Sequence, residues 1–394
     1  MKDFWAEELQ NQRKSKLKKL SVFISLIIFI IIVIILIIIY MNNINFRRWC
    51  DSNVLLKEIK QEDTRTIEID GDENTQIYAY DKYICIFRKK TLEIYNKVGS
   101  KISTIDLDIN KAVFNSSGRY LAISEENGQK FYLISGKEKI FENEIEGNIS
   151  QIHVSSSGYV AIVITNTSYK SIIDVYNREG KEIFKTNLVS SRVADVSISK
   201  DSKYLAIAEI DLSGILIKSN IQVVSIETAQ ENPENSIIYK YEAPTDKLIM
   251  NIEYQEKDTI LCMYNDSIDM LQNNQNKELI SFNNKSIAYM SIELDNRILA
   301  LEEISSGEYT SDSYIFIMNP VNQKNKEYII NDVAKEIYTY QNKIAINLGK
   351  ELHIINTNGI LLKKYISETE INDVVITDNL VGVIYRNSIQ IINL

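Results

Sequence analysis

One short apolar pattern recurs through most of the chain. It reads YICIF at 83–87, RYLAI at 119–123, YVAIV at 159–163, YLAIA at 204–208, TILCM at 259–263, RILAL at 297–301, KIAIN at 343–347 and LVGVI at 380–384. Successive copies follow at intervals of roughly 40 residues, a spacing typical of repeat architectures. Apolar runs of this length between polar segments indicate β-strands.

The segments around each copy repeat as well. A polar turn such as SKDSK at 199–203 comes before the strand, and a second apolar strand follows with an Asn turn that ends in Gly, as in DVYNREG at 174–180. Asn and Gly suit such turns because they adopt left-handed backbone angles at little cost. With a shorter polar strand added, the period predicts an all-β, eight-bladed β-propeller of four-stranded blades at 64–394. Seven blades is the alternative if the weak repeat around 248–282 is not a blade.

The two ends of the repeat region complement each other. The last repeat has strands at 372–377, 380–384 and 388–393 and then the chain ends, so its fourth strand is missing. The segment TRTIEID at 64–70 precedes the first full repeat and has no other partner. We expect it to pair with the last blade, because such pairing removes the free edge of an open ring.

This repeat resembles the WD40-like and quinoprotein-like propeller repeats, in which a turn of the type S-P-D-G-K leads into Y-L-A. The chain departs from them in lacking a Trp-Asp dipeptide and a Gly-His pair, and both tryptophans, Trp5 and Trp49, lie outside 64–394. As a whole the chain resembles bacterial single-pass membrane proteins with an extracytoplasmic propeller, a resemblance that implies a fold and no activity.

Residues 20–40 read LSVFISLIIFIIIVIILIIIY. As a helix this run would extend for about 30 Å, the thickness of a bilayer's hydrocarbon core. Several cations precede this run, whereas only Arg47 and Arg48 lie close after it. The positive-inside rule therefore places the N-terminus in the cytoplasm. We expect a cytoplasmic tail (1–19), a transmembrane helix in contact with the lipid bilayer (20–40), a linker (41–63) and an extracytoplasmic propeller (64–394).

The net charge and the absence of known motifs exclude several classes of ligand. The chain carries a net charge of −9, and residues 1–49 are basic, so the propeller is strongly acidic and predicts no nucleic-acid partner. The three cysteines and the two histidines, His153 and His353, lack the local spacing of a metal site, and no cofactor motif is present. We therefore expect neither metal nor cofactor.

The repeat itself suggests one constellation of polar residues. Inner strands line the central channel of a propeller, and one position at the start of each is polar. The candidate binding residues at this channel mouth are Gln76, Lys111, Gln151, Asp195, Asn251, Tyr289, Glu336 and Asp373. The long connections at 209–220 and 302–312, and an insert around 229–247, are expected on the same face.

These observations favour a non-enzymatic binding or scaffold protein of the cell envelope that uses the propeller as a platform for a protein or another ligand. Two alternatives remain open. One is an extracytoplasmic hydrolase or lyase with an acidic site at the channel mouth, and the other is a ligand sensor that acts through a membrane partner.

Overall fold

The computed structural model describes residues 2–394 apart from 56, 62–63, 72–73, 215, 246, 257, 274, 283–284, 306 and 308–310. The chain divides into two compact units, Met1–Lys57 and Glu58–Leu394.

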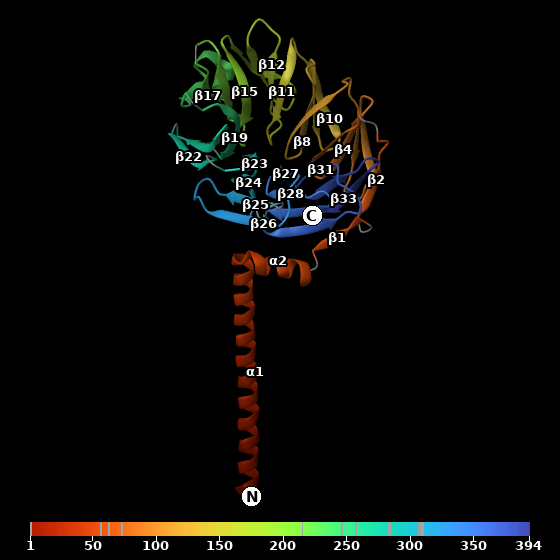
Figure 1. Ribbon diagram of the computed structural model, residues 1–394, viewed down its shortest axis with the longest axis vertical. Helices are drawn as coiled ribbons and strands as arrows, with labels where there is room; N and C mark the ends of the chain where they lie inside the picture. Colours follow the sequence, from red (N-terminus) through yellow and green to blue (C-terminus); the bar gives the residue numbers. More distant parts are fainter. Residues whose placement is uncertain are drawn as a thin grey trace. The chain divides into compact units, whose positions relative to one another are not determined.

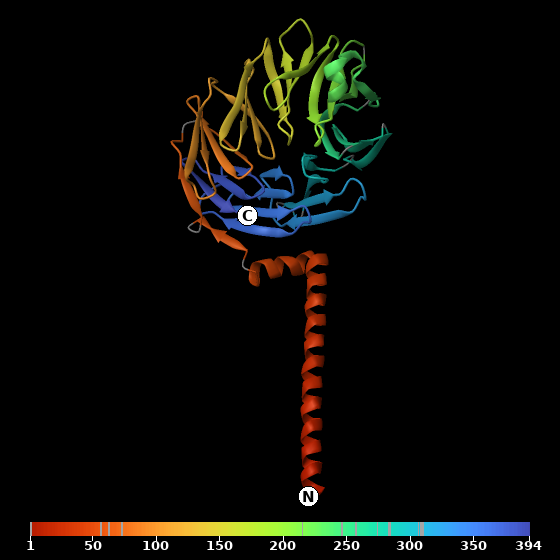
Figure 2. The same ribbon diagram turned by 180° about the vertical axis from the view of Figure 1, so that it is seen from behind.

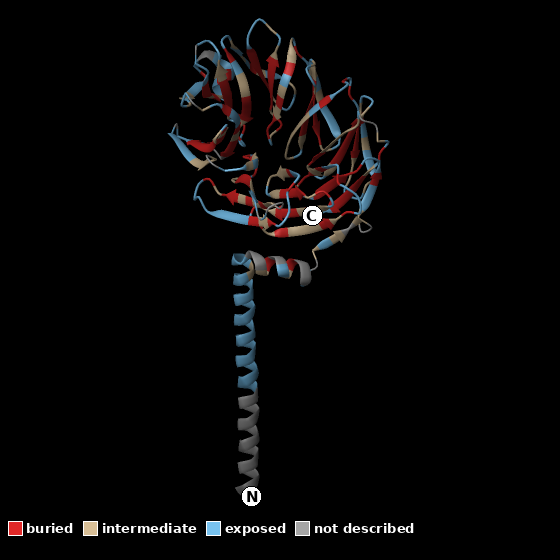
Figure 3. Cartoon of the chain, viewed as in Figure 1, coloured by how far each residue is buried: buried red, intermediate tan, exposed pale blue. Residues whose placement is uncertain are grey.

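The first unit is helical. It contains α1 (Lys2–Asn42) and α2 (Ile44–Asn53). Within α1, Lys19–Asn42 is 24 residues long, and by length and composition it is the one helix among the described residues that is able to cross a membrane. Its apolar side chains are exposed throughout (Figure 3), as a lipid-facing segment requires.

The second unit is a ring of eight sheets (Figures 1 and 2). Blade 1 contains β3 (Gln76–Tyr80), β4 (Tyr83–Arg88), β5 (Thr91–Tyr95) and β6 (Lys101–Asp106). Blade 2 contains β7 (Ala112–Ser117), β8 (Tyr120–Glu125), β9 (Lys130–Ser135) and β10 (Glu138–Glu144). Blade 3 contains β11 (Asn148–Val154), β12 (Val160–Thr165), β13 (Ser171–Tyr176) and β14 (Glu182–Leu188). Blade 4 contains β15 (Ser191–Ile198), β16 (Tyr204–Asp211), β17 (Lys218–Ser225) and β18 (Ile237–Glu242).

The second half of the ring continues the pattern. Blade 5 contains β19 (Ile249–Glu256), β20 (Thr259–Tyr264), β21 (Ser267–Gln272) and β22 (Gln275–Ser281). Blade 6 contains β23 (Ile287–Ser291), β24 (Ile298–Ser305), β25 (Ser311–Met318) and β26 (Asn325–Ile330). Blade 7 contains β27 (Glu336–Tyr340), β28 (Lys343–Asn347), β29 (Glu351–Asn356) and β30 (Leu361–Ile366), and blade 8 contains β31 (Asp373–Ile376), β32 (Leu380–Ile384) and β33 (Ser388–Asn393). The prediction of eight blades is confirmed, and the seven-blade alternative is wrong because 249–281 forms a complete blade.

The segment before the first blade supplies two further strands. The strand β2 (Arg65–Glu68) pairs antiparallel with β33 and is the fourth strand of blade 8. The strand β1 (Glu58–Lys60) adds a fifth strand to blade 7 by pairing parallel with β30. Residues 41–63, predicted as a linker, therefore contain α2 and β1. These elements form because Asn43 caps α2 and because Ile59 packs against the core between blades 7 and 8.

The hydrophobic core consists of eight clusters, one at each junction between neighbouring blades. The second and third strands of each blade are buried almost throughout, whereas the outermost strands are largely exposed (Figure 3). At the junction of blades 8 and 1, Ile67 and Ile69 pack with Ile84, Ile389 and Ile391. Each sheet therefore depends on its neighbours for burial, as in other repeat proteins.

A recurring Asn turn connects the third and fourth strands. In blade 3 the side chain of Asn177 accepts hydrogen bonds from the backbone N–H groups of Glu179 and Lys181, at 3.1 and 2.9 Å. Gly180 follows at a φ of +81°, a conformation that glycine adopts without a steric penalty. Asn356 and Gly359 repeat this arrangement in blade 7.

The up-and-down order of the strands gives the ring two distinct faces. We call the face where the inner strands begin the entry face; it carries the connections from second to third strands and from each fourth strand to the next blade. The opposite exit face carries the other turns. The insert of blade 4, α3 (Ile226–Glu231) with a 3-10 turn (Pro233–Asn235), connects β17 to β18 and so belongs to the exit face. The expectation of an entry-face insert at 229–247 was wrong, because β18 lies within that range.

Candidate functional site

Three of the eight predicted binding residues join neighbouring inner strands. Gln76 donates to the carbonyl of Ala112 and accepts from its N–H, both at 2.8 Å, and so connects blades 1 and 2. Gln151 donates to the carbonyl of Ala194 at 2.8 Å. Asp195 accepts from the N–H of Ile252 at 2.9 Å. These polar groups hold the ring together because they satisfy backbone groups of the next blade.

The remaining five lie at or near the starts of their strands. Lys111 is exposed and pairs with Glu126 at 2.5 Å. Asn251 is exposed and lies 3.5 Å from Asp195 through its amide nitrogen. Tyr289 is half-buried, and burial raises its pKa.

The predicted residues of blades 7 and 8 meet at a tyrosine. Glu336 and Asp373 are both exposed, and Tyr338 donates to Glu336. Burial raises the pKa of Tyr338, and hydrogen bonds to Glu336 and Asp373 raise it further. The predicted residues thus form local groups, and a binding site for one ligand at a channel mouth shared by all eight stays a prediction.

A charged group lies further along the inner strands of four consecutive blades. We call it the axial cluster: His153, Asp195, Ser197, Glu253 and Glu293. The His153 Nε2 is 3.2 Å from an Asp195 carboxylate oxygen, and Ser197 donates to Glu253 at 3.3 Å. Strand alternation explains the grouping, because residues two or four positions apart on an inner strand share its axial face.

Three members of the axial cluster have raised pKa values. Burial raises the pKa of Glu253 to about 8, and the charges of Glu293 and Asp195 add to this effect against the opposing influence of His153. Loss of hydration also raises the pKa of Glu293. Burial alone would lower the pKa of His153, but the hydrogen bond to Asp195 and the surrounding carboxylates outweigh it and raise the value.

The negative charge of Glu293 also affects a tyrosine of blade 1. Burial raises the pKa of Tyr78 on β3, and the charge of Glu293 after β23 raises it further. The cluster combines a carboxyl whose pKa is raised to about 8, an imidazole 3.2 Å from the carboxylate group of Asp195, and a serine hydroxyl. These groups can donate or accept hydrogen bonds and can transfer protons.

Sequence reasoning missed most of this group. It selected Asp195 and set His153 aside because no second histidine is near; His353 indeed lies in blade 7, where it contacts Tyr328 and Glu351. The signal that was available is the alternation itself: His153 and Glu253 each follow a selected residue by two positions. Among the described residues, no group of three or more His, Cys, Asp or Glu side chains is arranged to hold a metal ion.

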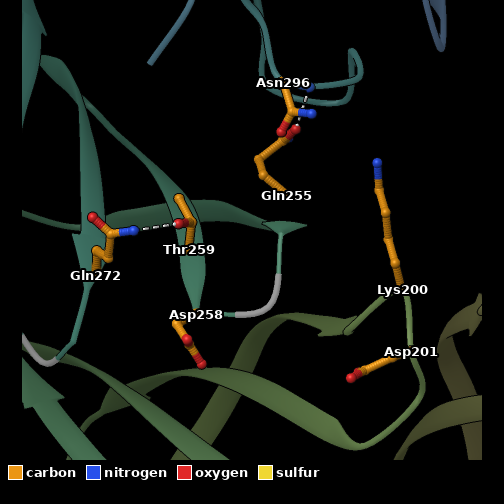
Figure 4. Close-up of a pocket in the computed structure, with 7 residues that line it drawn as sticks. All are labelled: Lys200, Asp201, Gln255, Asp258, Thr259, Gln272 and Asn296. Carbon is orange, nitrogen blue, oxygen red and sulfur yellow. Dashed lines mark hydrogen bonds between the residues drawn. The ribbon is translucent and has the colours of Figure 1, made fainter. Parts of the chain in front are cut away.

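The exit face carries a polar hollow of about 600 Å³. Its lining residues are Lys200, Asp201, Gln255, Asp258, Thr259, Gln272 and Asn296 (Figure 4). Gln255 binds both the carbonyl of Ile292 and the N–H of Asn296, at 2.7 Å each, and Lys200 pairs with Asp295 at 2.6 Å. These contacts connect blades 4, 5 and 6, so much of the lining serves to join blades.

Both faces of the ring expose large apolar side chains, and among the described residues the entry face exposes more of them. Connections and strand ends of blades 4–6 on this face expose Val189, Leu212, Leu216, Ile217, Leu248, Met250 and Ile304. Among the described residues, the turns and strand ends of the exit face expose Val98, Ile102, Ile237, Ile238 and Val321. A group of exposed apolar side chains on one face of a protein is typical of interaction surfaces.

The fold and these surfaces define the class of protein: an eight-bladed propeller preceded by an apolar helix long enough to cross a membrane. Residues 57–394 match the model of the family of unknown function DUF5711, and the chain belongs to that family.

Solved structures with a similar fold include several propellers. They include BamB from Moraxella catarrhalis (11% identity, 84% of this chain and 98% of that chain, TM-score 0.49) and apo AztD from Citrobacter koseri (8%, 81% and 90%, 0.47). A third is the Cps50 (Swd1) propeller domain from Myceliophteria thermophila (12%, 84% and 99%, 0.45). No curated protein matches the sequence.

Proposed function

We propose that this protein is a membrane-anchored binding protein of the cell envelope, whose propeller docks a protein partner on its entry face. The observation that carries this proposal is the group of exposed apolar residues on the connections of blades 4–6. A protein partner fits this surface because burial of apolar area drives protein association.

The anchor in this proposal is Lys19–Asn42. Its apolar run is too long for a typical signal peptide and ends in Tyr40, Met41 and Asn42 rather than in a small-residue cleavage site. The basic residues before it favour a cytoplasmic N-terminus and an extracytoplasmic propeller.

Exposed apolar residues of this face lie on connections between strands, both within a blade and between neighbouring blades. Val189 lies between β14 and β15, Leu216 lies between β16 and β17, and Leu248 lies between β18 and β19. Hydrogen bonds tie the last two of these connections together, because Ser219 at the start of β17 accepts from the N–H groups of Ala243 and Ile249, at 2.9 and 3.2 Å. Loops held on a rigid scaffold in this way are common binding elements.

Site-specific photocrosslinking tests the docking face. A photoreactive phenylalanine analogue in place of Leu216, which is 63% exposed, should give a discrete protein adduct in intact cells. The same group in place of Val321, 64% exposed on the exit face, is the matched control and should not give that adduct. Leu212→Asp together with Ile217→Asp should abolish the adduct at 216. Identical adducts from both positions, or none from position 216, would contradict the proposed face.

A second candidate function is acid–base catalysis in the channel, as in a hydrolase or lyase. The specific observation is the pKa of Glu253, raised to about 8 beside His153 and Asp195, since shifted carboxyls often serve as general acids. Turnover of an envelope polymer by the purified protein, lost on Glu253→Gln and kept on Glu242→Gln, would favour this candidate over the binding role.

A further inference from the structure

The junction of the two helices is held by hydrogen bonds. Arg47 on α2 is only 5% exposed, and its guanidinium donates to the carbonyls of Tyr40 and Met41, at 3.0 and 2.7 Å. These carbonyls belong to the last turn of α1, where backbone carbonyl groups have no hydrogen-bond donors within the helix itself. The cation also complements the negative end of the helix dipole.

A second set of contacts holds the same junction of α1 and α2, which we call the corner. The Tyr40 hydroxyl donates to a carboxylate oxygen of Asp51 at 2.7 Å, and Lys57 pairs with Asp51 at 2.5 Å. Asp51 is almost completely buried. A charged pair in this setting is strongly favoured over its separated members. The start of α2 therefore cannot move independently of the end of α1.

The other side of α2 presents apolar groups to its surroundings. Trp49 is 57% exposed and stacks on Phe46, with ring centroids 6.2 Å apart. Val54 and Leu55, directly after the helix, are also exposed. The two polar groups Arg47 and Asp51 point into the corner instead. The helix thus has a polar side that is occupied by contacts with α1 and an aromatic side on which Trp49 is exposed.

We propose that α2 lies at the outer surface of the bilayer, with Trp49 and Phe46 inserted at the level of the lipid headgroups. This inference rests on the proposed membrane crossing by α1. The occupant of the aromatic side is lipid because the apolar span ends at Asn42, directly before α2, and the corner fixes α2 at the depth of that end. Tryptophan and tyrosine prefer this depth, where one part of the ring is apolar and another reaches water.

The two tryptophans allow a direct test, because Trp5→Phe leaves Trp49 as the only tryptophan of the full chain. The protein is reconstituted in phosphatidylcholine vesicles that carry bromine either near the headgroup end or near the terminal methyl of the acyl chains. Trp49 emission should be quenched more by the shallow bromines than by the deep ones. Arg47→Ala should reduce the shallow quenching by about twofold or more, because it removes the corner that holds the ring at the interface.

The outcomes separate the two proposals. Flotation of the chain with vesicles, without quenching of Trp49 by either lipid, would overturn the placement of α2 and leave the anchor intact. Absence of the chain from floated vesicles would overturn both. Stronger quenching by deep than by shallow bromines would also contradict the interfacial position.

Discussion

Ile67→Asp should be the most destabilising of the single changes considered, because it opens the ring at its seam. Ile67 is 3% exposed on β2 and packs with Ile84, Ile389 and Ile391 between blades 8 and 1. Loss of a buried isoleucine costs roughly 2–5 kcal/mol, and the buried unpaired carboxylate adds to this. We expect a loss of about 4 kcal/mol or more, seen as a lower denaturant midpoint of the full chain in detergent.

The same strand provides the control. Arg65 is exposed on β2, so Arg65→Asp introduces the same residue without touching the core and should change stability by less than about 0.5 kcal/mol. If the two variants unfold at the same denaturant concentration, the closing contact of β2 contributes nothing and the seam is held in another way.

Glu253→Gln should stabilise the protein at pH 8 and leave it unchanged near pH 4.5. The pKa of Glu253 in the folded protein is raised to about 8 from its ordinary 4.5. Between these values the folded chain keeps a proton that the unfolded chain has lost, so stability falls as the pH rises. His153 acts in the same direction, because its raised pKa adds stability below its ordinary pKa of 6.5 that is lost as the pH rises through the folded value.

The expected gain of the Gln variant at pH 8 is on the order of 2 kcal/mol, measured by denaturant unfolding at a series of pH values. Glutamine fits because it is neutral, nearly isosteric and still able to accept the hydrogen bond from Ser197. Glu242→Gln, on the exposed strand β18, should follow the natural protein at every pH. A Glu253→Gln profile parallel to that of the natural protein would contradict the protonated state of this carboxyl.

The blades could be predicted because their signal is local and repeated. Each second strand is a short apolar run such as YLAIA at 204–208, and each buried run needs a neighbouring blade to cover it. The Asn turns at 177 and 356 are equally local, since one side chain closes each turn. The missing strand of blade 8 was traceable because only 64–70 lacked a partner.

The features that escaped prediction depend on contacts between distant residues. The helix α2 is fixed by Arg47 and Asp51 through the end of α1, which its composition does not reveal. The insert at 226–235 was misplaced because β18, which is largely exposed although its Ile and Tyr residues are typical of a strand, was assigned together with it to one long connection. The axial cluster combines residues from four blades, so neither His153 nor Glu253 carries a recognisable motif alone.

Cysteine labelling in intact cells tests the proposed topology, in which the propeller lies on the opposite side of the membrane from the N-terminus. Cys85 and Cys262 are fully buried, so Cys50→Ser gives a background in which a new surface cysteine dominates the reaction with a membrane-impermeant maleimide. Val321→Cys should be labelled in intact cells, and Ser15→Cys only after the membrane is permeabilised. Labelling of Ser15→Cys in intact cells, or of Val321→Cys only after permeabilisation, would contradict this topology.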